Sequence, residues 1–203
     1  MRRKNKLIKN ENAKATDDES RKERILDAAL ELFATQGYGS TRVETIAKKA
    51  KLSYGLTYYH FSSKDILFHM VLQRSLDRST TIYQSAMGRE DSAYEKLRYF
   101  AETFLAYAKT KEGASGLLIM SHALTSDGIP QLTRIMVRDR MQQLGGILEG
   151  MIKEAQADGH AADKSSAALA SMFLALIIGS AFLRIANAKS DFPDTDTFLC
   201  FLS

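Results

Sequence analysis

The sequence predicts an all-α protein, with a small N-terminal three-helix domain followed by a larger helical domain. Only two prolines occur in 203 residues, and Ala, Leu, Lys and Glu, which favour helices, are plentiful. Apolar residues recur three and four positions apart in one segment after another, which is the period of an amphipathic helix. We find no alternating apolar and polar runs of the kind that predict strands.

Positive charge is concentrated near the N-terminus. Residues 1–70 contain 14 Lys and Arg against 9 Asp and Glu, whereas residues 71–203 contain 14 against 15. A basic N-terminal third fits a polyanionic partner, because phosphate contacts need clustered cations. The alternative is a solvated basic tail, since six of these cations lie within residues 2–14.

The N-terminal third divides into an arm and a first helix. Residues 1–19 are polar and lack periodicity, so we expect a flexible basic arm. Ser20 and Glu23 have the spacing of a capping box, which predicts that a helix begins there. Gly37 is the expected stop, because glycine tolerates a left-handed conformation. The apolar face of this helix is expected to be Ile25, Ala28, Ala29, Leu32 and Phe33.

Two further short helices follow. A second capping box, from Thr41 to Glu44, predicts one helix, and Ser53 is a suitable cap for the next, which contains LSYGLTYYHF. Three helices then lie within about 40 residues, and a turn of about three residues separates the last two. This is the layout of a helix-turn-helix, at about residues 44–63.

The third helix has an unusual composition at its start. Gly55 lies in its first turn, where the absence of a side chain would let the backbone approach base edges in a major groove. Ser53 and Tyr54 lie at the same end and are suited to reach bases or phosphates. Leu56 has no donor but is suited to contact a thymine methyl group.

The other end of this helix carries neutral hydrogen-bond donors. Tyr58, Tyr59 and His60 are suited to bind phosphate oxygens and fix the register of the protein on a duplex. Lys64, near the start of the next helix, adds a cation beside a helix N-terminus. Tyr58 and His60 each also have a simpler interpretation. Tyr58 would be an ordinary core residue, and His60 would bond to a nearby carbonyl.

Residues 20 to about 68 resemble the DNA-binding domain of TetR-type (TetR/AcrR) transcriptional regulators. The matching stretches are RILDAALELFATQGY, T-x-V-x-x-IA, S-x-G and YYHF-x-x-K, which extend over three helices at fixed spacing. The resemblance implies a homodimer with a DNA-binding domain at 20–66 and a ligand-binding and dimerisation domain at 67–203. It also implies that the last long helices, at about 163–203, pair between the two copies.

The resemblance also implies a set of DNA contacts. Glu44 is suited to accept from cytosine or merely to close the capping box, and of these we favour the capping box. Two positions depart from the family pattern: Lys51 replaces a glycine in the turn, and Thr57 replaces a large apolar residue. The implied contacts are Thr41, Arg42, Glu44, Ser53, Tyr54, Gly55, Leu56, Tyr58, Tyr59, His60 and Lys64.

Longer helices are expected after the first domain. The segment 165–183 contains nineteen residues without a charge, which is close to the lower limit for a membrane span. Its Ala and Ser content favours a buried or dimer-forming helix, so we expect no membrane contact, with a membrane-anchored sensor as an alternative. The other expected helices are 64–88, 91–111, a segment after Gly113 and Gly116 that contains LLIMSHAL, and 130–158.

The sequence contains no catalytic motif that we recognise. HExxH, GxSxG, a phosphate-binding Gly-Lys loop and CxxC are all missing, which predicts no enzyme and no cofactor. His69, His122 and His160 lack the spacing of metal ligands, so we expect no metal site. The single cysteine, Cys200, excludes an internal disulfide and fits a reducing cytoplasm.

The resemblance implies a small-molecule pocket in the second domain. For each candidate the alternative is an ordinary core position. We therefore expect a cytoplasmic, ligand-responsive regulator, most simply a homodimeric repressor released from a palindromic double-stranded DNA operator by a small-molecule effector of unknown type. A helical adaptor with only non-specific DNA contacts is the alternative. The pocket candidates are Phe100, Phe104, Tyr107, Met120, His122, Met136, Met141 and Phe173.

Overall fold

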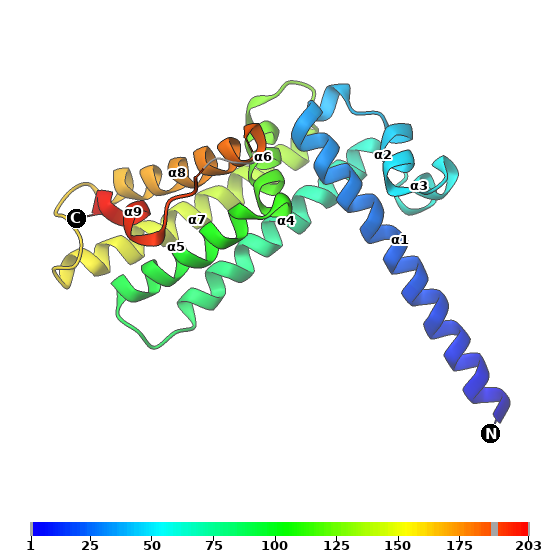
Figure 1. The fold of residues 1–203 in the computed structure, drawn as a ribbon, viewed down its shortest axis with the longest axis horizontal. Helices are drawn as coiled ribbons and strands as arrows, with labels where there is room; N and C mark the ends of the chain where they lie inside the picture. The colour runs from blue at the N-terminus through cyan, green and yellow to red at the C-terminus, as the bar shows by residue number, and fades with distance from the viewer. Residues whose placement is uncertain (1, 188–190, 203) are drawn as a thin grey trace. The chain divides into compact units, whose positions relative to one another are not determined.

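The computed structural model describes residues 2–187 and 191–202, with side chains from residue 16 onward. The chain forms two compact units, Met1–Val71 and Leu72–Ser203. Every regular element of the described residues is a helix, so the predicted all-α class is confirmed (Figure 1). The elements are α1 (Arg2–Ser40), α2 (Val43–Ala50), α3 (Tyr54–His60), α4 (Lys64–Met87), α5 (Ala93–Lys109), α6 (Lys111–Thr125), α7 (Gln131–Ala157), α8 (Ser166–Ala186), α9 (Thr195–Leu199) and the 3₁₀ turn η1 (Cys200–Leu202).

Helix α1 begins earlier than the sequence predicted. It starts at Arg2 and so includes the segment 2–19, which we expected to lack regular structure. That segment contains no Gly or Pro, and it includes four Lys, two Glu and two Ala, so no helix breaker interrupts it. The expected stop at Gly37 is confirmed: with φ 78° and ψ 165°, this glycine interrupts the helical backbone.

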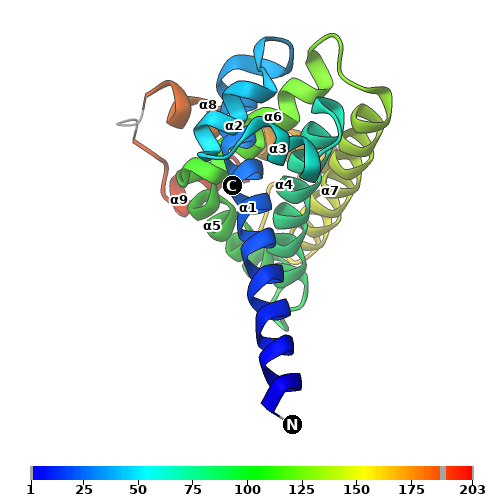
Figure 2. The same ribbon diagram turned by 90° about the vertical axis from the view of Figure 1, so that its right-hand side faces the viewer.

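Helices α2 and α3 pack beside the C-terminal half of α1 in the N-terminal unit (Figure 2). The core of this unit contains Ile25, Phe33 and Ile46, all fully buried. Between α2 and α3, Lys51 adopts the left-handed conformation with φ 56° and ψ 43°. The guanidinium of Arg24 donates to the Ala50 carbonyl at 2.6 Å, which ties this turn to α1.

The two predicted capping boxes are wrong, although two predicted serine caps are confirmed. Ser20 lies inside the continuous helix α1 and caps nothing. Thr41 is buried and donates its hydroxyl to the Gly37 carbonyl at 2.7 Å, and the residue before α2 makes no side-chain cap. By contrast, Ser53 accepts from the Leu56 amide at 3.2 Å and Ser63 from the Ile66 amide at 3.1 Å.

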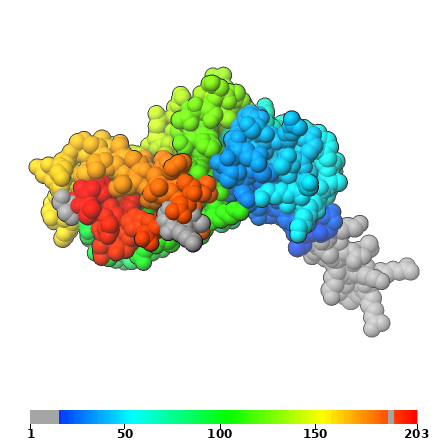
Figure 3. All heavy atoms as spheres, turned by 45° about the horizontal axis from the view of Figure 1, so that its top comes forward, coloured from blue at the N-terminus to red at the C-terminus, as the bar shows by residue number. Residues whose placement is uncertain are grey.

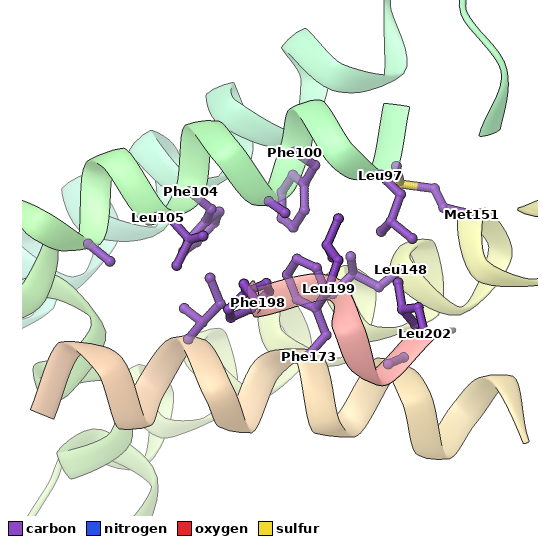
Figure 4. Close-up of a cluster of buried hydrophobic side chains, with 14 of the residues drawn as sticks. Leu97, Phe100, Phe104, Leu105, Leu148, Met151, Phe173, Phe198, Leu199 and Leu202 are labelled. Carbon is purple, nitrogen blue, oxygen red and sulfur yellow. The ribbon is translucent and has the colours of Figure 1, made fainter. Parts of the chain in front are cut away.

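Helices α5, α6, α7 and α8 pack against one another in the C-terminal unit. The close-up in Figure 4 shows α5 contributing Leu97, Phe100 and Phe104, with Phe173 from α8 facing them. The short helix α9 inserts Phe198 among these side chains, at 5.0 Å from the Phe173 ring centroid. The tail after Pro193 therefore completes the core of this unit.

Helix α6 begins before its two glycines, contrary to expectation. Thr110 caps it by accepting from the Gly113 amide at 2.9 Å, so Gly113 lies inside the first turn. A Cβ atom at Gly113 would lie 2.0 Å from the Tyr107 carbonyl oxygen. Glycine is therefore required here for close approach of α6 to the end of α5, rather than as a helix breaker.

Helix α8 is apolar on both its covered and its uncovered sides. By length and composition it could cross a membrane: an 18-residue stretch of it has a mean hydropathy of 2.1, and 28% of that stretch is buried within the chain. One side packs Leu169, Phe173 and Ile177 into the core. The other side leaves Leu176 and Phe182 exposed, and α8 lies open along one face of its unit in Figure 3.

Candidate functional site

Helix α3 has Thr57 on its buried side. Thr57 is fully buried, and its hydroxyl donates to the Ser53 carbonyl at 3.2 Å. Threonine replaces the larger apolar residue expected here, and it is buried against the rest of the unit, while its hydroxyl bond stays within α3 and its N-cap. With Thr57 facing inward, the tyrosines on the remaining sides of α3 are exposed.

Three tyrosines present hydroxyl groups on the exposed side of α3. Tyr54, Tyr58 and Tyr59 are 46%, 37% and 78% exposed. The rings of Tyr54 and Tyr58 lie 4.7 Å apart by centroid. A hydrogen bond with Tyr58 raises the pKa of Tyr54 to about 12, and partial desolvation and the Glu44 carboxylate contribute to the rise. Tyr54 is thus neutral near physiological pH, which suits it to donate to phosphate or base oxygens.

The start of α2 lies beside this tyrosine pair. Glu44 is exposed, and its negative charge contributes to the raised pKa of Tyr54. Arg42, the residue before α2, is also exposed. The capping role that we favoured for Glu44 is wrong, because no side chain caps α2 and Thr41 bonds elsewhere. Glu44 therefore retains its acceptor capacity.

Gly55 has open space where a side chain would be. A Cβ atom built there meets nothing within 4 Å, and the residue lies within the regular helix α3. Neither packing nor backbone conformation in the chain requires glycine at this position. A side chain at this position would therefore affect only a molecule that approaches α3 from outside the chain.

Lys64 is held at the start of α4 by contacts with α1. Its Nζ lies 4.3 Å from the centroid of the Tyr38 ring and 3.3 Å from the Gly39 carbonyl oxygen. The Tyr38 hydroxyl bonds in turn to Asp65. Burial lowers the pKa of Lys64, with Asp65 opposing the shift. A positioned cation therefore stands beside the N-terminus of α4, where its dipole also favours an anion.

Two of the predicted DNA contacts are poorly placed. The side chain of Thr41 is buried, with its hydroxyl bonded to backbone carbonyls of α1. The side chain of His60 is 5% exposed, and its Nε2 lies 3.6 Å from Asp18 Oδ1. His60 therefore packs against α1 rather than facing outward. The remaining predicted side chains of α2 and α3 are exposed or half-buried.

The C-terminal unit contains a cavity of about 280 Å³, partly open to solvent, among α4, α5, α6, α7 and α8. Its interior is mostly apolar, and a group of polar side chains from α4 and α7 also borders it. A smaller apolar cavity of about 100 Å³ shares four of its lining residues. The lining residues are Leu76, Ser79, Thr80, Tyr83, Gln84, Phe100, Phe104, Leu117, Met120, Arg140, Met141, Gln143, Leu144, Ile147, Phe173, Leu174, Ile177 and Ile178.

Five of the eight predicted pocket residues line this cavity: Phe100, Phe104, Met120, Met141 and Phe173.

The other three do not line this cavity. Tyr107 buries its hydroxyl beside Gly116, and His122 and Met136 are half-buried positions outside the lining.

The polar residues of the cavity were missed, Arg140 above all. No sequence pattern singles out Arg140, because only the packing of α4 against α7 brings it to the cavity. Its guanidinium lies 3.4 Å from Thr80 Oγ1 and 3.6 Å from Asp77 Oδ1.

Two family models match the two parts of the chain. The model for bacterial regulatory proteins of the tetR family matches residues 25–71, and the model for the tetracyclin repressor-like C-terminal domain matches residues 93–195. A helix-turn-helix unit joined to a helical unit with a cavity thus defines a bacterial DNA-binding regulator. The chain belongs to the TetR family.

Individual relatives agree with this assignment. HbdR, an HTH-type transcriptional regulator from Aromatoleum sp. (strain CIB), is 25% identical over 142 residues, which are 70% of this chain and 60% of HbdR. The HTH-type transcriptional repressor KstR2 from Mycolicibacterium smegmatis is 29% identical over 141 residues, covering 69% of this chain and 67% of KstR2. The crystal structure of the MbdR regulator from Azoarcus sp. CIB shares the fold, with a TM-score of 0.78 at 24% identity over 90% of this chain and 97% of MbdR.

Proposed function

We propose that the chain is a sequence-specific transcriptional regulator that binds a palindromic operator as a homodimer and is released by a small molecule. The observation that carries the proposal is the exposed N-terminal end of α3, where Gly55 leaves open space beside Ser53 and Tyr54. A helix end of this kind is suited to place its backbone against base edges in a major groove.

The exposed residues of this surface divide into base and phosphate contacts. Ser53, Tyr54, Gly55 and Leu56 would face the bases. The carboxylate of Glu44 takes no part in a helix cap, and it would accept a hydrogen bond from a cytosine amino group. The phosphate contacts would be Arg42, Tyr58, Tyr59 and Lys64, and the side chains of Thr41 and His60 are left out because they are buried.

A second copy of the chain would cover the uncovered side of α8. Met172, Leu176 and Leu183 repeat at helical spacing on that side, and a Cβ atom added to Gly179 between them would meet nothing within 4 Å. An exposed apolar stripe with a glycine suits close packing of two helices. The homodimer is proposed to form through α8 and its neighbours, within about residues 163–203.

The effector would act through α4. Residues of its C-terminal half, including Leu76, Thr80 and Tyr83, line the cavity, while Lys64 stands at its first position. A ligand that binds better to one position of α4 than to another would shift the population between two forms of the dimer. If one form spaces the two α3 helices unsuitably for successive major grooves, operator affinity falls.

Selection from random duplexes tests the DNA-binding proposal. The full chain is incubated with a random double-stranded library at low and at moderate salt, and bound sequences are enriched over several rounds. We expect a palindrome whose half-sites lie about one helical turn apart. A flat sequence profile with steep salt dependence would instead indicate the helical adaptor with non-specific contacts.

We also propose that the chain is cytoplasmic, with the apolar side of α8 covered by protein rather than by lipid. Cell fractionation tests this localisation. The full chain is expected in the fraction that remains after membranes are removed by centrifugation. Recovery only after addition of detergent would support the membrane-anchored sensor instead, since α8 alone has the length and hydropathy of a span among the described helices.

A further inference from the structure

We propose that the effector is an amphipathic monocarboxylate, whose apolar body fills the cavity and whose carboxylate binds Arg140. This inference rests on the proposed function, because it assigns a ligand class to the cavity of the regulator. It follows from the chemistry of the two parts of the lining.

The interior of the cavity is suited to hydrocarbon. Phe100, Phe104 and Phe173 form one wall, with ring centroids 5.2 Å apart for the first pair and 5.5 Å for Phe100 and Phe173. Leu117 and Ile177 also line this space. A charged or strongly polar group placed here would lose its hydration without a compensating bond. The body of the ligand must therefore be apolar.

The adjoining small cavity extends the apolar space. It shares Leu117, Met120, Met141 and Ile178 with the larger one. The main volume of about 280 Å³ is close to the lower end of the ~300–1,000 Å³ typical of small-molecule sites. The two volumes together fit a chain or ring of modest size rather than a large multi-ring ligand.

Arg140 is the single charged side chain among the described lining residues. Burial raises the pKa of Tyr83, so this second titratable group of the lining stays neutral. Arg140 also forms an ion pair with Asp77 Oδ1 at 3.6 Å, and Asp77 lies outside the lining. The one formal charge among the described lining residues is therefore positive, and a ligand carboxylate that bound Arg140 would compete with Asp77 for it.

The contacts that Arg140 makes within the chain are long. Its NH1 atom lies 3.4 Å from Thr80 Oγ1 and its NH2 atom 3.6 Å from Asp77 Oδ1. Charge-assisted hydrogen bonds are typically ~2.7–2.9 Å, and a guanidinium carries several donors arranged to match a carboxylate. A ligand carboxylate would thus make shorter bonds to Arg140 than its present partners do.

Three ligands with the same tail and different heads test the head-group charge. Octanoate, octan-1-ol and octylammonium are each titrated into the full chain by isothermal calorimetry near neutral pH. We expect octanoate to bind at least about tenfold more tightly than octan-1-ol, because a hydrogen bond to a charged group is worth that much or more. Octylammonium is expected to bind most weakly. Equal or tighter binding of the alcohol or the amine would overturn the inference, as would no binding of any of the three.

Matched variants locate the interaction. Arg140→Met should reduce octanoate affinity at least about tenfold and leave octan-1-ol affinity nearly unchanged. Arg138→Met, at an exposed position of α7 outside the lining, is the control and should change neither. Ile178→Trp, at a half-buried lining position, should weaken both ligands by filling the cavity. Octanoate affinity that is unchanged in Arg140→Met would overturn the assignment of the carboxylate.

Operator binding of the same preparations separates this inference from the proposed function. A chain that binds octanoate through Arg140 but selects no operator retains the ligand assignment and contradicts the regulator. A chain that selects a palindrome but prefers octan-1-ol retains the regulator and contradicts the anionic effector.

Discussion

At Gly55, the effect of a substitution on stability is expected to differ in sign from its effect on operator binding. Because a Cβ atom there meets nothing within 4 Å, Gly55→Ala is expected to fold normally and to gain about 0.5–1 kcal/mol in stability from its higher helix propensity. The added methyl group would nevertheless face the bases, so operator affinity should fall about tenfold or more. Urea unfolding measures the first effect, and fluorescence anisotropy with the selected duplex measures the second.

The control for this substitution is Gly88→Ala in the C-terminal unit, where the nearest atom to an added Cβ is the Gln84 carbonyl oxygen at 3.4 Å. It should leave operator affinity unchanged. If Gly55→Ala binds the operator as tightly as the parent chain, α3 does not approach the bases with this turn.

Lys51 carries backbone strain that glycine would relieve. Its left-handed conformation, with φ 56°, costs a residue with a Cβ about 1–2 kcal/mol. Glycine avoids this strain in the folded state, but part of the gain is lost because glycine has a larger conformational entropy in the unfolded chain. Lys51→Gly should therefore raise the free energy of unfolding by about 0.5 kcal/mol, as measured by urea denaturation. A decrease in stability would show that the lysine side chain contributes more than the strain costs.

Tyr107 buries a hydroxyl for which the described residues supply no hydrogen-bond partner. Tyr107→Phe removes this group with little change of shape, so stability at neutral pH should rise by about 1 kcal/mol in urea unfolding. Unchanged or lower stability would indicate a partner for the hydroxyl.

The same residue predicts a pH dependence. Burial raises the pKa of Tyr107 to about 12, with Glu112 adding to the shift. A raised folded-state pKa stabilises the fold fully below the unfolded value of 10.0, and this contribution is lost as pH rises from 10.0 through about 12. Thermal unfolding of the parent and of Tyr107→Phe over this range should show a widening difference in favour of the variant.

The sequence predicted which helices exist more accurately than it predicted where each helix begins. Ser53 and Ser63 were correct caps, and each ends a short segment, 51–53 or 61–63, that is not helical in the structure. Ser20 has the same local pattern, yet no residue before it breaks a helix, so α1 continues through it. A capping box therefore predicts an N-terminus only where something ends the preceding turn.

The cavity of the C-terminal unit shows why a site on several helices is harder to predict than one on a single helix. The exposed tyrosines of α3 are neighbours in the sequence, so their shared surface could be predicted from spacing alone. Arg140 reaches the cavity only because α7 packs beside α4, and that packing depends on side chains distributed over the whole unit. Five of the aromatic and methionine candidates line the cavity, as expected if apolar residues line most pockets, whereas Met136 is of the same residue type and lies outside the lining.

For the whole molecule, the proposed function requires that two copies present α3 to two half-sites together, and the uncovered side of α8 is where we expect them to meet. Leu176 is 42% exposed in the chain and would be buried in the dimer. Leu176→Arg would place an unpaired charge in that interface at a cost of about 3 kcal/mol or more, which raises the dimer dissociation constant about 100-fold or more.

Analytical ultracentrifugation of Leu176→Arg should show a monomer at concentrations where the parent is a dimer, and the variant should lose most of its affinity for the full palindrome. Ala106→Arg adds the same charge at an exposed position of α5 and should remain dimeric. A monomer retains one intact α3, so the variant and the parent should bind a duplex with a single half-site with the same weak affinity. This result would separate loss of the dimer from loss of the fold. A Leu176→Arg chain that stays dimeric would move the interface to another surface.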